Sequence, residues 1–156
     1  TLNRRILLND KANLRSLVET IIEKSAGMPI VAPMHTYVSD AIKSLGITAP
    51  NLHILPPQSY LSFGYLMSKA KGIITDSGNV AEEATFLGTP CITLNTYSEH
   101  PETWRIGTNE LVGEDPVALS NAMDVLMRGE WKHGELPERW DGRTADRIVQ
   151  ILSEHQ

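Results

Sequence analysis

The feature that most constrains the fold is a repeated alternation between short apolar runs and longer stretches with apolar residues at helical spacing. The short runs are IVAP at 30–33, LHIL at 52–55, GIIT at 72–75, CITL at 91–94 and, more weakly, ELVG at 110–113. Such runs fit buried β-strands, and strands that alternate with helices are typical of βαβ units. The sequence therefore predicts an α/β fold: a Rossmann-like, three-layer αβα sandwich with a parallel sheet.

Between the strands the apolar spacing predicts amphipathic helices. They are expected at 12–24, 37–45, 59–71, 80–87, around 119–126 and around 145–152. On the helix at 59–71 the apolar residues expected to face the core are Leu61, Tyr65, Leu66 and Ala70.

Bulk properties exclude several classes of partner. A length of 156 residues fits one domain, 1–156, and a net charge of -5 without a basic run argues against nucleic acid. No apolar run approaches the ~18 residues of a membrane span, so no membrane contact is expected. The lone Cys91, in an apolar run, fits a reducing, cytoplasmic compartment, and the histidines show no metal-ligand spacing. Because the first residue is Thr1, the chain could be a fragment of a longer protein.

The strand at 72–75 ends in the polar elbow DSGN, and a helix follows at once. The start of a helix offers unpaired N–H groups and a partial positive charge, and small residues there let a phosphate approach closely. Ser77 and Gly78 fit this role well, and Asn79 fits it in part. The elbow is therefore a candidate phosphate site at the carboxyl end of a strand, where α/β folds bind ligands.

Two acids follow the elbow and have different interpretations. Glu83 lies one helical turn beyond Asn79, so its carboxylate could accept both hydroxyls of a ribose. Glu82 lies three residues after Asn79 and fits a capping box. An ordinary helix start remains open as the alternative, because Ser, Gly and Asn begin many helices and Glu is common in their first turn.

Longer sequence motifs around the elbow are more specific than the elbow itself. TDSGNVAEEATFLGTPCITL, SEHPETWRIGTNELVG and WDGRTADRIVQIL follow one another. In this order they resemble the carboxyl-terminal half of the non-hydrolysing UDP-N-acetylglucosamine 2-epimerases, whose pattern is TDSGGxQEE, TERPE, GTN, LVG and WDG followed by A-x-R-I. TLNRR at the start is similar to the family's T-x-H-R-R, and PMH, with His35, to its P-x-H. The resemblance covers essentially the whole chain.

This resemblance implies one half of a two-domain, GT-B-like fold with the active site between the halves. The family interconverts UDP-N-acetylglucosamine and UDP-N-acetylmannosamine by elimination and re-addition of UDP, for cell-surface polysaccharide precursors, and it needs no cofactor. Its amino-terminal half supplies the carboxylates that move protons, and its carboxyl-terminal half holds UDP. The implied partners are UDP or a UDP-N-acetylhexosamine and the missing amino-terminal domain, and a homodimer stays open.

By the same resemblance, six residues contact the substrate: Gln58, Phe63, Ser77, Gly78, Asn79 and Glu83. Ser77, Gly78 and Asn79 would contact the diphosphate. Glu83 would contact the ribose, and Gln58 and Phe63 would contact the uridine. An aromatic ring suits a flat base, although a ring on a helix also suits a core. His35 follows a strand end, and both a cleft position and an ordinary loop position remain open for it.

Three departures from the family pattern bear on chemistry. Asn3 stands where the family has a histidine, and asparagine cannot move a proton near neutral pH, so the catalytic residues stay unassigned. Asn95 replaces an arginine, and Asn79 replaces a second glycine. His100 or Arg105 could restore the lost positive charge. The alternatives are a catalytically silent UDP-sugar binding module and a GT-B glycosyltransferase domain.

Overall fold

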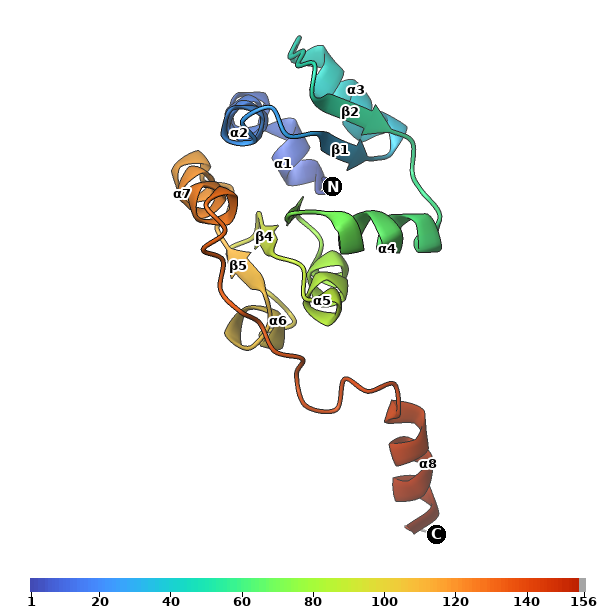
Figure 1. The fold of residues 1–156 in the computed structure, drawn as a ribbon. Helices are drawn as coiled ribbons and strands as arrows, with labels where there is room; N and C mark the ends of the chain where they lie inside the picture. The colour runs from blue at the N-terminus through green and yellow to red at the C-terminus, as the bar shows by residue number, and fades with distance from the viewer. Residues whose placement is uncertain (155–156) are drawn as a thin grey trace.

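The structure, a computed structural model, describes residues 1–154 and has an α/β architecture (Figure 1). The helices are α1 (Arg5–Asn9), α2 (Lys11–Lys24), α3 (Thr36–Ser44), α4 (Tyr60–Lys69), α5 (Gly78–Leu87), α6 (Glu102–Arg105), α7 (Pro116–Met127) and α8 (Thr144–Glu154). The strands are β1 (Ile30–Pro33), β2 (Leu52–Leu55), β3 (Ile73–Thr75), β4 (Cys91–Thr93) and β5 (Asn109–Leu111). The five expected strands and six expected helices are confirmed, with ends shifted by a few residues. The short helices α1 and α6 were not predicted.

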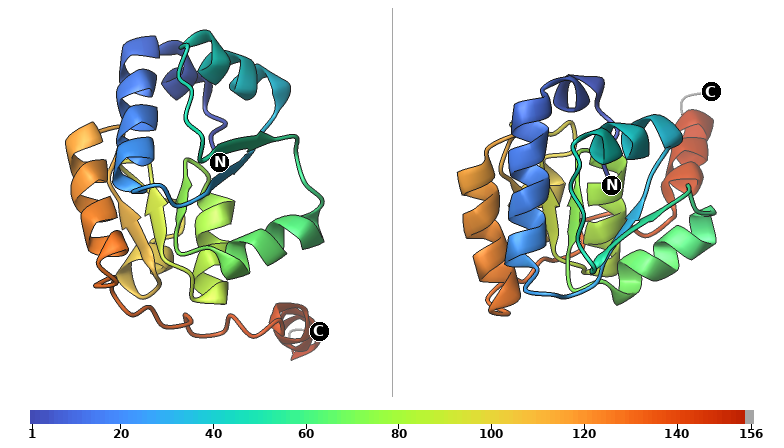
Figure 2. Two further views of the ribbon diagram at one scale, coloured as in Figure 1. Left: turned by 45° about the horizontal axis from the view of Figure 1, so that its top comes forward. Right: turned by 90° about the horizontal axis from the view of Figure 1, so that it is seen from above.

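The strands are parallel and fall into two hydrogen-bonded groups. β1 pairs with β2, with Ile30 opposite Leu52, and a second group has the order β3-β4-β5. Helices α2 and α7 lie on one side of the second group, and α4 and α5 lie on the other (Figures 1 and 2). This layered arrangement of helices and parallel strands confirms the predicted fold class.

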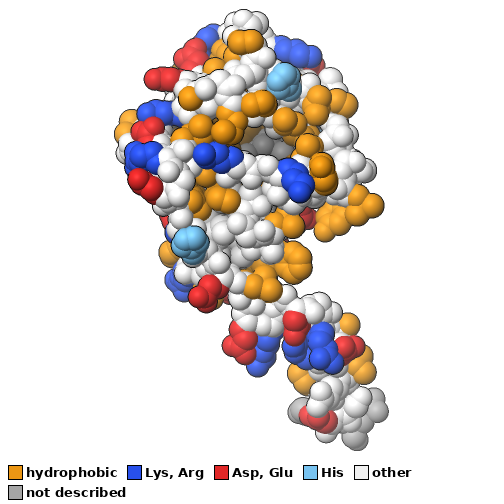
Figure 3. Space-filling view, in the orientation of Figure 1, with side chains coloured by type: hydrophobic (Ala, Val, Ile, Leu, Met, Phe, Trp, Pro, Cys, Tyr) orange, Lys and Arg blue, Asp and Glu red, His pale blue; other side chains and the backbone are white. Residues whose placement is uncertain are grey.

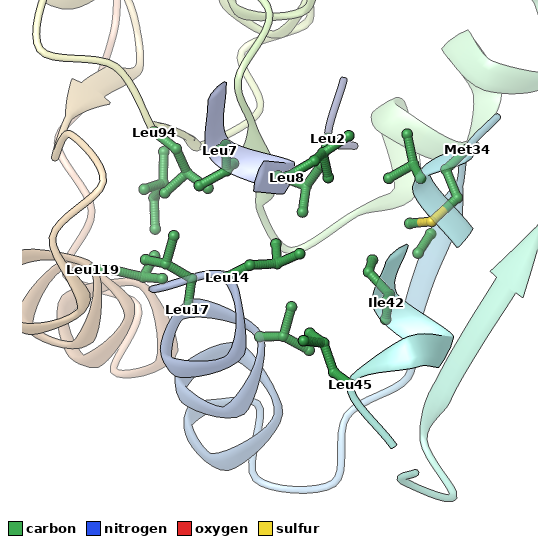
Figure 4. Packing of buried hydrophobic residues seen from close by; sticks show 14 of the residues in the cluster. Leu2, Leu7, Leu8, Leu14, Leu17, Met34, Ile42, Leu45, Leu94 and Leu119 are labelled. Atoms are coloured by element: carbon green, nitrogen blue, oxygen red, sulfur yellow. The ribbon is translucent and has the colours of Figure 1, made fainter. Parts of the chain in front are cut away.

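The main core joins α1, α2, α3 and α7 to the strands. Its fully buried side chains include Leu7, Leu14, Leu17, Val38, Ile92, Leu94 and Leu119 (Figure 4 shows most of them). α2 packs against α7, and Lys24 Nζ donates to Asp124 Oδ1 at 2.8 Å across the ends of these helices. The core therefore holds α2, from the start of the chain, against α7, which lies about one hundred residues later.

Helix α4 buries a different face from the one predicted. Leu61, Tyr65 and Ala70 are exposed, and only Leu66 is partly covered. α4 instead packs against α5 through Met67, with Phe63 partly buried beside it. The prediction was wrong because α4 is apolar on more than one side, so spacing alone could not tell which side α5 would cover.

Helix α8 lies apart from the rest of the structure, beyond an extended segment (Figure 1). It buries no residue, and its apolar side chains, such as Ile148, Val149 and Leu152, are largely exposed. Within residues 1–154 no helix is both long and apolar enough to cross a membrane.

The corrected face of α4 leads to a stability prediction. Met67→Ala should lower the free energy of unfolding by about 2–5 kcal/mol, the usual cost of emptying a core position. Leu61→Ala on the same helix should change it by less than about 0.5 kcal/mol, because Leu61 is 81% exposed and Met67 only 3%. Urea denaturation of both variants checks this. Equal losses would contradict the packing of α4 on α5.

Candidate functional site

A polar pocket of about 240 Å³ lies where β3 and β4 end. Its walls come from the elbow after β3, the end of β4, the loop before α6 and the residue before α1. The polar side chains among its lining residues are Arg4, Asp76, Ser77, Asn79, Thr93, Asn95, Tyr97, Ser98, Glu99, His100 and Asn109. The carboxyl ends of parallel strands are the usual place for a ligand in such folds.

The amino-terminal end of α5 faces this pocket. Ser77 is the N-cap in an extended conformation, and no side chain caps the helix. The backbone N–H of Ser77 donates to Thr75 Oγ1 at 3.1 Å. The N–H groups of the first helical turn have no carbonyl partner within a helix, and the helix dipole adds partial positive charge there. This end of α5 can therefore bind an anion.

Gly78 is not required by the backbone at this position. Its φ is not among the positive values found at six other glycines. A Cβ added to it would make only ordinary contact, 3.4 Å from His100 Cδ2. Neither conformation nor packing demands a glycine here, and the missing Cβ leaves the start of α5 open to close approach by a ligand.

Asp76 holds the beginning of the chain at this pocket through hydrogen bonds. One oxygen of its carboxylate accepts the backbone N–H groups of Asn3 and Arg4, each at 2.7 Å. Its other oxygen is buried without a hydrogen-bond partner. Arg4 Nη1 donates to Asn95 Oδ1, and Asn95 Nδ2 donates to the Asp76 carbonyl at 3.2 Å. These bonds hold the Arg4 guanidinium beside the elbow.

His100 closes the other side of the pocket. Its Nδ1 lies 3.0 Å from Glu82 Oε1, and its backbone N–H donates to Ser98 Oγ at 3.0 Å. Glu82 therefore pairs with His100 and does not complete a capping box with Asn79. The capping-box prediction was wrong because α5 begins at Gly78, which places Asn79 inside the helix and not at its cap.

The floor of the pocket rests on a buried polar network. Asn109 is fully buried; its Oδ1 accepts from Thr93 Oγ1 at 2.6 Å, and its Nδ2 donates to Thr103 Oγ1 at 3.2 Å. Gly107, two residues earlier, lies so close to Thr85 and to the Thr103 carbonyl that a Cβ would come within 2.6 Å of their atoms. Packing and hydrogen bonding beneath the pocket thus explain the GTN motif at residues 107–109.

Of the residues predicted for the site, the structure brings Ser77, Gly78, Asn79, Asn95 and His100 together around this pocket. Arg4, Tyr97 and Ser98 were missed by sequence reasoning. The first basic residue of the TLNRR motif was the available signal for Arg4, and the SEHPETW motif was the signal for Ser98, whereas Tyr97 carried none.

Gln58, Phe63 and Glu83 do not line the pocket. Gln58 is exposed, and its Nε2 donates to the Pro56 carbonyl at 2.8 Å. Phe63 is partly buried and packs beside Met67, which is a core contact. Burial raises the pKa of the Glu83 carboxyl, and the neighbouring charge of Glu82 raises it further.

Three other candidates also lie outside the pocket. His35 is the N-cap residue of α3 and stacks on Tyr37, with ring centroids 5.8 Å apart. The Tyr37 hydroxyl contacts Asn3 Oδ1, so Asn3 and His35 both meet the same tyrosine. Arg105 lies over the Trp104 ring, 5.0 Å from its centroid. Among residues 1–154 no three His, Cys, Asp or Glu side chains are grouped to hold a metal ion.

The parallel strands, the uncapped helix start at their carboxyl ends and the nearby Arg4 are features of the class of α/β domains that bind phosphate-bearing ligands. The sequence profile of the family described as UDP-N-acetylglucosamine 2-epimerase matches residues 1–153. The chain belongs to this family.

Curated relatives and solved structures agree with this assignment. A UDP-N-acetylglucosamine 2-epimerase of Methanocaldococcus jannaschii is 33% identical over 162 residues, which cover 98% of this chain and 43% of the relative. A UDP-2,3-diacetamido-2,3-dideoxy-D-glucuronate 2-epimerase of Pseudomonas aeruginosa is 34% identical over 98% of this chain and 43% of its own length. The crystal structure of the Neisseria meningitidis UDP-GlcNAc 2-epimerase bound to UDP-GlcNAc has a TM-score of 0.83 and 30% identity, covering 98% of this chain and 43% of that one. This chain thus spans less than half the length of these relatives.

The raised pKa of Glu83 gives a pH prediction. The folded protein holds the Glu83 proton more tightly than the unfolded chain does, so the charged carboxylate destabilises the fold. This destabilisation is absent at pH values below the ordinary pKa of 4.5 and is complete at pH values above the raised pKa of the folded protein. The stability of Glu83→Gln relative to the original chain should therefore increase as pH rises through that window, as urea denaturation at a series of pH values would show.

Glu19→Gln is the matched control, because Glu19 is an exposed glutamate on a different helix, α2. Its stability relative to the original chain should not show the same rise. A Glu83→Gln difference that is flat with pH would contradict the effect of burial.

Proposed function

We propose that this chain is the UDP-binding part of an epimerase that inverts C2 of a UDP-N-acetylhexosamine. The observation that carries the proposal is the uncapped start of α5 beside Arg4 and His100, at a glycine that the fold itself does not need. Support also comes from relatives, including the Methanocaldococcus jannaschii UDP-GlcNAc 2-epimerase solved in complex with UDP-GlcNAc and UDP.

In this proposal the diphosphate lies at the start of α5, where Ser77, Gly78 and Asn79 offer N–H groups. Arg4 would supply positive charge from one side of the pocket, and His100 would line the other side. His100, held by its 3.0 Å contact with Glu82, would take the place in the pocket of the arginine that Asn95 replaces.

The nucleoside end of the ligand extends away from the polar pocket. Glu83, further along α5, would accept the ribose hydroxyls, and Gln58 and Phe63 would contact the uracil. Because these three side chains lie outside the pocket, the ligand must cross the surface between α5 and α4. The sugar would then point toward the cleft with the amino-terminal half.

The proposed reaction removes a proton from C2 of the sugar and breaks its bond from C1 to oxygen, releasing UDP. A proton then returns to C2 from the opposite face, and UDP adds again to C1. The carboxylates that move the protons would belong to the amino-terminal half. The role of this chain would be to stabilise the negative charge that develops on the departing UDP. The product would serve polysaccharide precursor synthesis in the cytoplasm.

A second candidate is a UDP-sugar binding module without catalysis. Two observations favour it: Asn3, at the family's histidine position, contacts Tyr37, and Asn95, at the family's arginine position, accepts a hydrogen bond from Arg4. A GT-B glycosyltransferase domain is disfavoured by family membership and by the SEHPETW and GTN words.

Calorimetry on Gly78→Ala tests the binding site. The original chain should bind UDP weakly, because it forms one wall of a cleft, and it should bind NADP less well. The added Cβ should obstruct the diphosphate and weaken UDP binding by roughly tenfold, about 1.4 kcal/mol. Stability should stay the same or rise by up to about 1 kcal/mol, because Ala is the better helix residue. The combination of weaker binding and retained stability is specific to a ligand role.

Gly88→Ala is the control for this substitution. Gly88 ends the same helix in the left-handed region, with a φ of 69°, so alanine there should cost about 1 kcal/mol of stability without a change in UDP affinity. Equal UDP affinity in the original chain and Gly78→Ala, or a preference for NADP, would overturn the proposed site.

The division of labour between the halves is tested by deuterium exchange. The chain alone, with UDP-N-acetylglucosamine in D₂O, should incorporate no deuterium at C2 by NMR, because its pocket has no assigned proton-transfer group. Addition of an amino-terminal half from a relative should start incorporation if this chain is an epimerase part, and should not if it is a silent module. Clear incorporation by the chain alone would contradict the assignment of proton transfer to the other half.

A further inference from the structure

Asn95 follows β4 at the edge of the polar pocket, and hydrogen bonds hold it in one orientation. Its backbone carbonyl accepts the Gly113 N–H at 3.1 Å, and its side-chain Nδ2 donates to the Asp76 carbonyl at 3.2 Å. Its side-chain Oδ1 accepts from Arg4 Nη1. A reversed amide would place its NH₂ group against the guanidinium and its oxygen against a carbonyl, so both bonds require this orientation.

The Arg4 guanidinium is therefore held without being neutralised. Asn95 is an uncharged partner, and none of the ion pairs among residues 1–154 includes Arg4. The Asp76 oxygen that bonds to this segment accepts backbone N–H groups, those of Asn3 and Arg4. A guanidinium has several N–H donors and Asn95 accepts from one of them, so its charge and its further donors remain for a ligand.

The rest of the molecule offers an anion little attraction. The net charge is -5, and Figure 3 shows Lys and Arg side chains interspersed with Asp and Glu over the face that it displays. Among the described residues that line the pocket, Arg4 is the one Lys or Arg, and the acids Asp76 and Glu99 lie in the same lining. Binding of an anion at the start of α5 thus depends strongly on where this guanidinium is held.

From these observations we propose that Asn95 is a positioning residue that prepares Arg4 to bind the diphosphate. Its neutral amide holds the guanidinium beside the start of α5, and the other N–H groups of Arg4 bind the phosphate oxygens. This inference rests on the proposed function and deepens it. At the position where the family has an arginine, Asn95 would act on the ligand through Arg4 and not by direct contact.

The chemistry of residue 95 decides whether this arrangement works. An aspartate there would accept the same hydrogen bond but would pair with the guanidinium and neutralise its charge. An apolar side chain would leave the guanidinium without its partner, so Arg4 would have to be ordered when the ligand binds, at a cost in conformational entropy. A neutral acceptor avoids both losses.

A double-mutant cycle measured by calorimetry with pyrophosphate tests the role of Asn95. Arg4→Gln removes the charge but keeps the backbone N–H that bonds to Asp76, and it should weaken pyrophosphate binding by roughly tenfold. Asn95→Leu removes the acceptor at similar size and should weaken binding by about three- to tenfold. The double variant should bind pyrophosphate as Arg4→Gln does, because Asn95 acts only through Arg4.

NMR of the Arg4 guanidinium gives a second readout, which a purely structural role of Asn95 would not change. The bond to Asn95 should slow rotation of the guanidinium and give separate Nη signals in the original chain, and these should merge in Asn95→Leu. Asn95→Asp should keep the signals separate and still weaken pyrophosphate binding, because it holds Arg4 but neutralises it.

Two matched variants control for general effects of charge and tethering. Arg5→Gln removes the same charge one residue later, from an exposed side chain that does not line the pocket. Asn13→Leu removes another long-range tether, since Asn13 Nδ2 donates to the Glu114 carbonyl at 2.9 Å. Both should leave pyrophosphate affinity unchanged. Urea denaturation should show that every variant folds, and Asn95→Ser replaces Asn95→Leu in the cycle if leucine prevents folding.

Several results would overturn the proposal. They are additive losses in the cycle, which would mean that Asn95 contacts the anion directly, unchanged affinity in Asn95→Leu, and no binding of pyrophosphate by the original chain. Failure of the proposed function looks different. UDP that binds no more tightly than pyrophosphate would contradict a UDP site, while the expected cycle with pyrophosphate would still support the role of Asn95.

Discussion

The buried carboxylate of Asp76 is the contact on which the candidate site depends. It lies directly after β3 and accepts the N–H groups of Asn3 and Arg4. Charge-assisted bonds of this kind are among the stronger ones in proteins, and here they join the start of the chain to residues more than seventy positions later. Through this contact the Arg4 guanidinium, the Asn95 amide and the start of α5 come to share one pocket.

The pocket combines rigid and adjustable parts. β3, β4 and the Asn109 network beneath them are buried and hydrogen-bonded, so the start of α5 is held in place. His100 and Glu82 are about one-third exposed and pair across the loop before α6. An anion that enters would thus meet fixed backbone N–H groups and a side chain able to adjust.

The same geometry supports the proposal that this chain forms one side of a larger site. Gln58 and Glu83 lie outside the pocket, and the apolar side chains of α8 are exposed away from the main core. The longer relatives carry more than half of their length outside the matched region. In the proposed function, the sugar end of a ligand bound at α5 would be open to whatever covers these surfaces.

The sequence by itself determined the α/β class, the five parallel strands and the elbow at the end of β3, because alternating apolar spacing and turn residues are local signals. It also placed Ser77, Gly78 and Asn79 where the pocket is found. It could not select the buried face of α4, since Leu61 and Met67 are both apolar and only contact with α5 distinguishes them. Tertiary structure alone paired Glu82 with His100, brought Arg4 to Asp76, and left a cavity between β1 and β3. Each of these depends on residues far apart in the chain, and their meeting is decided by packing and charge across the fold.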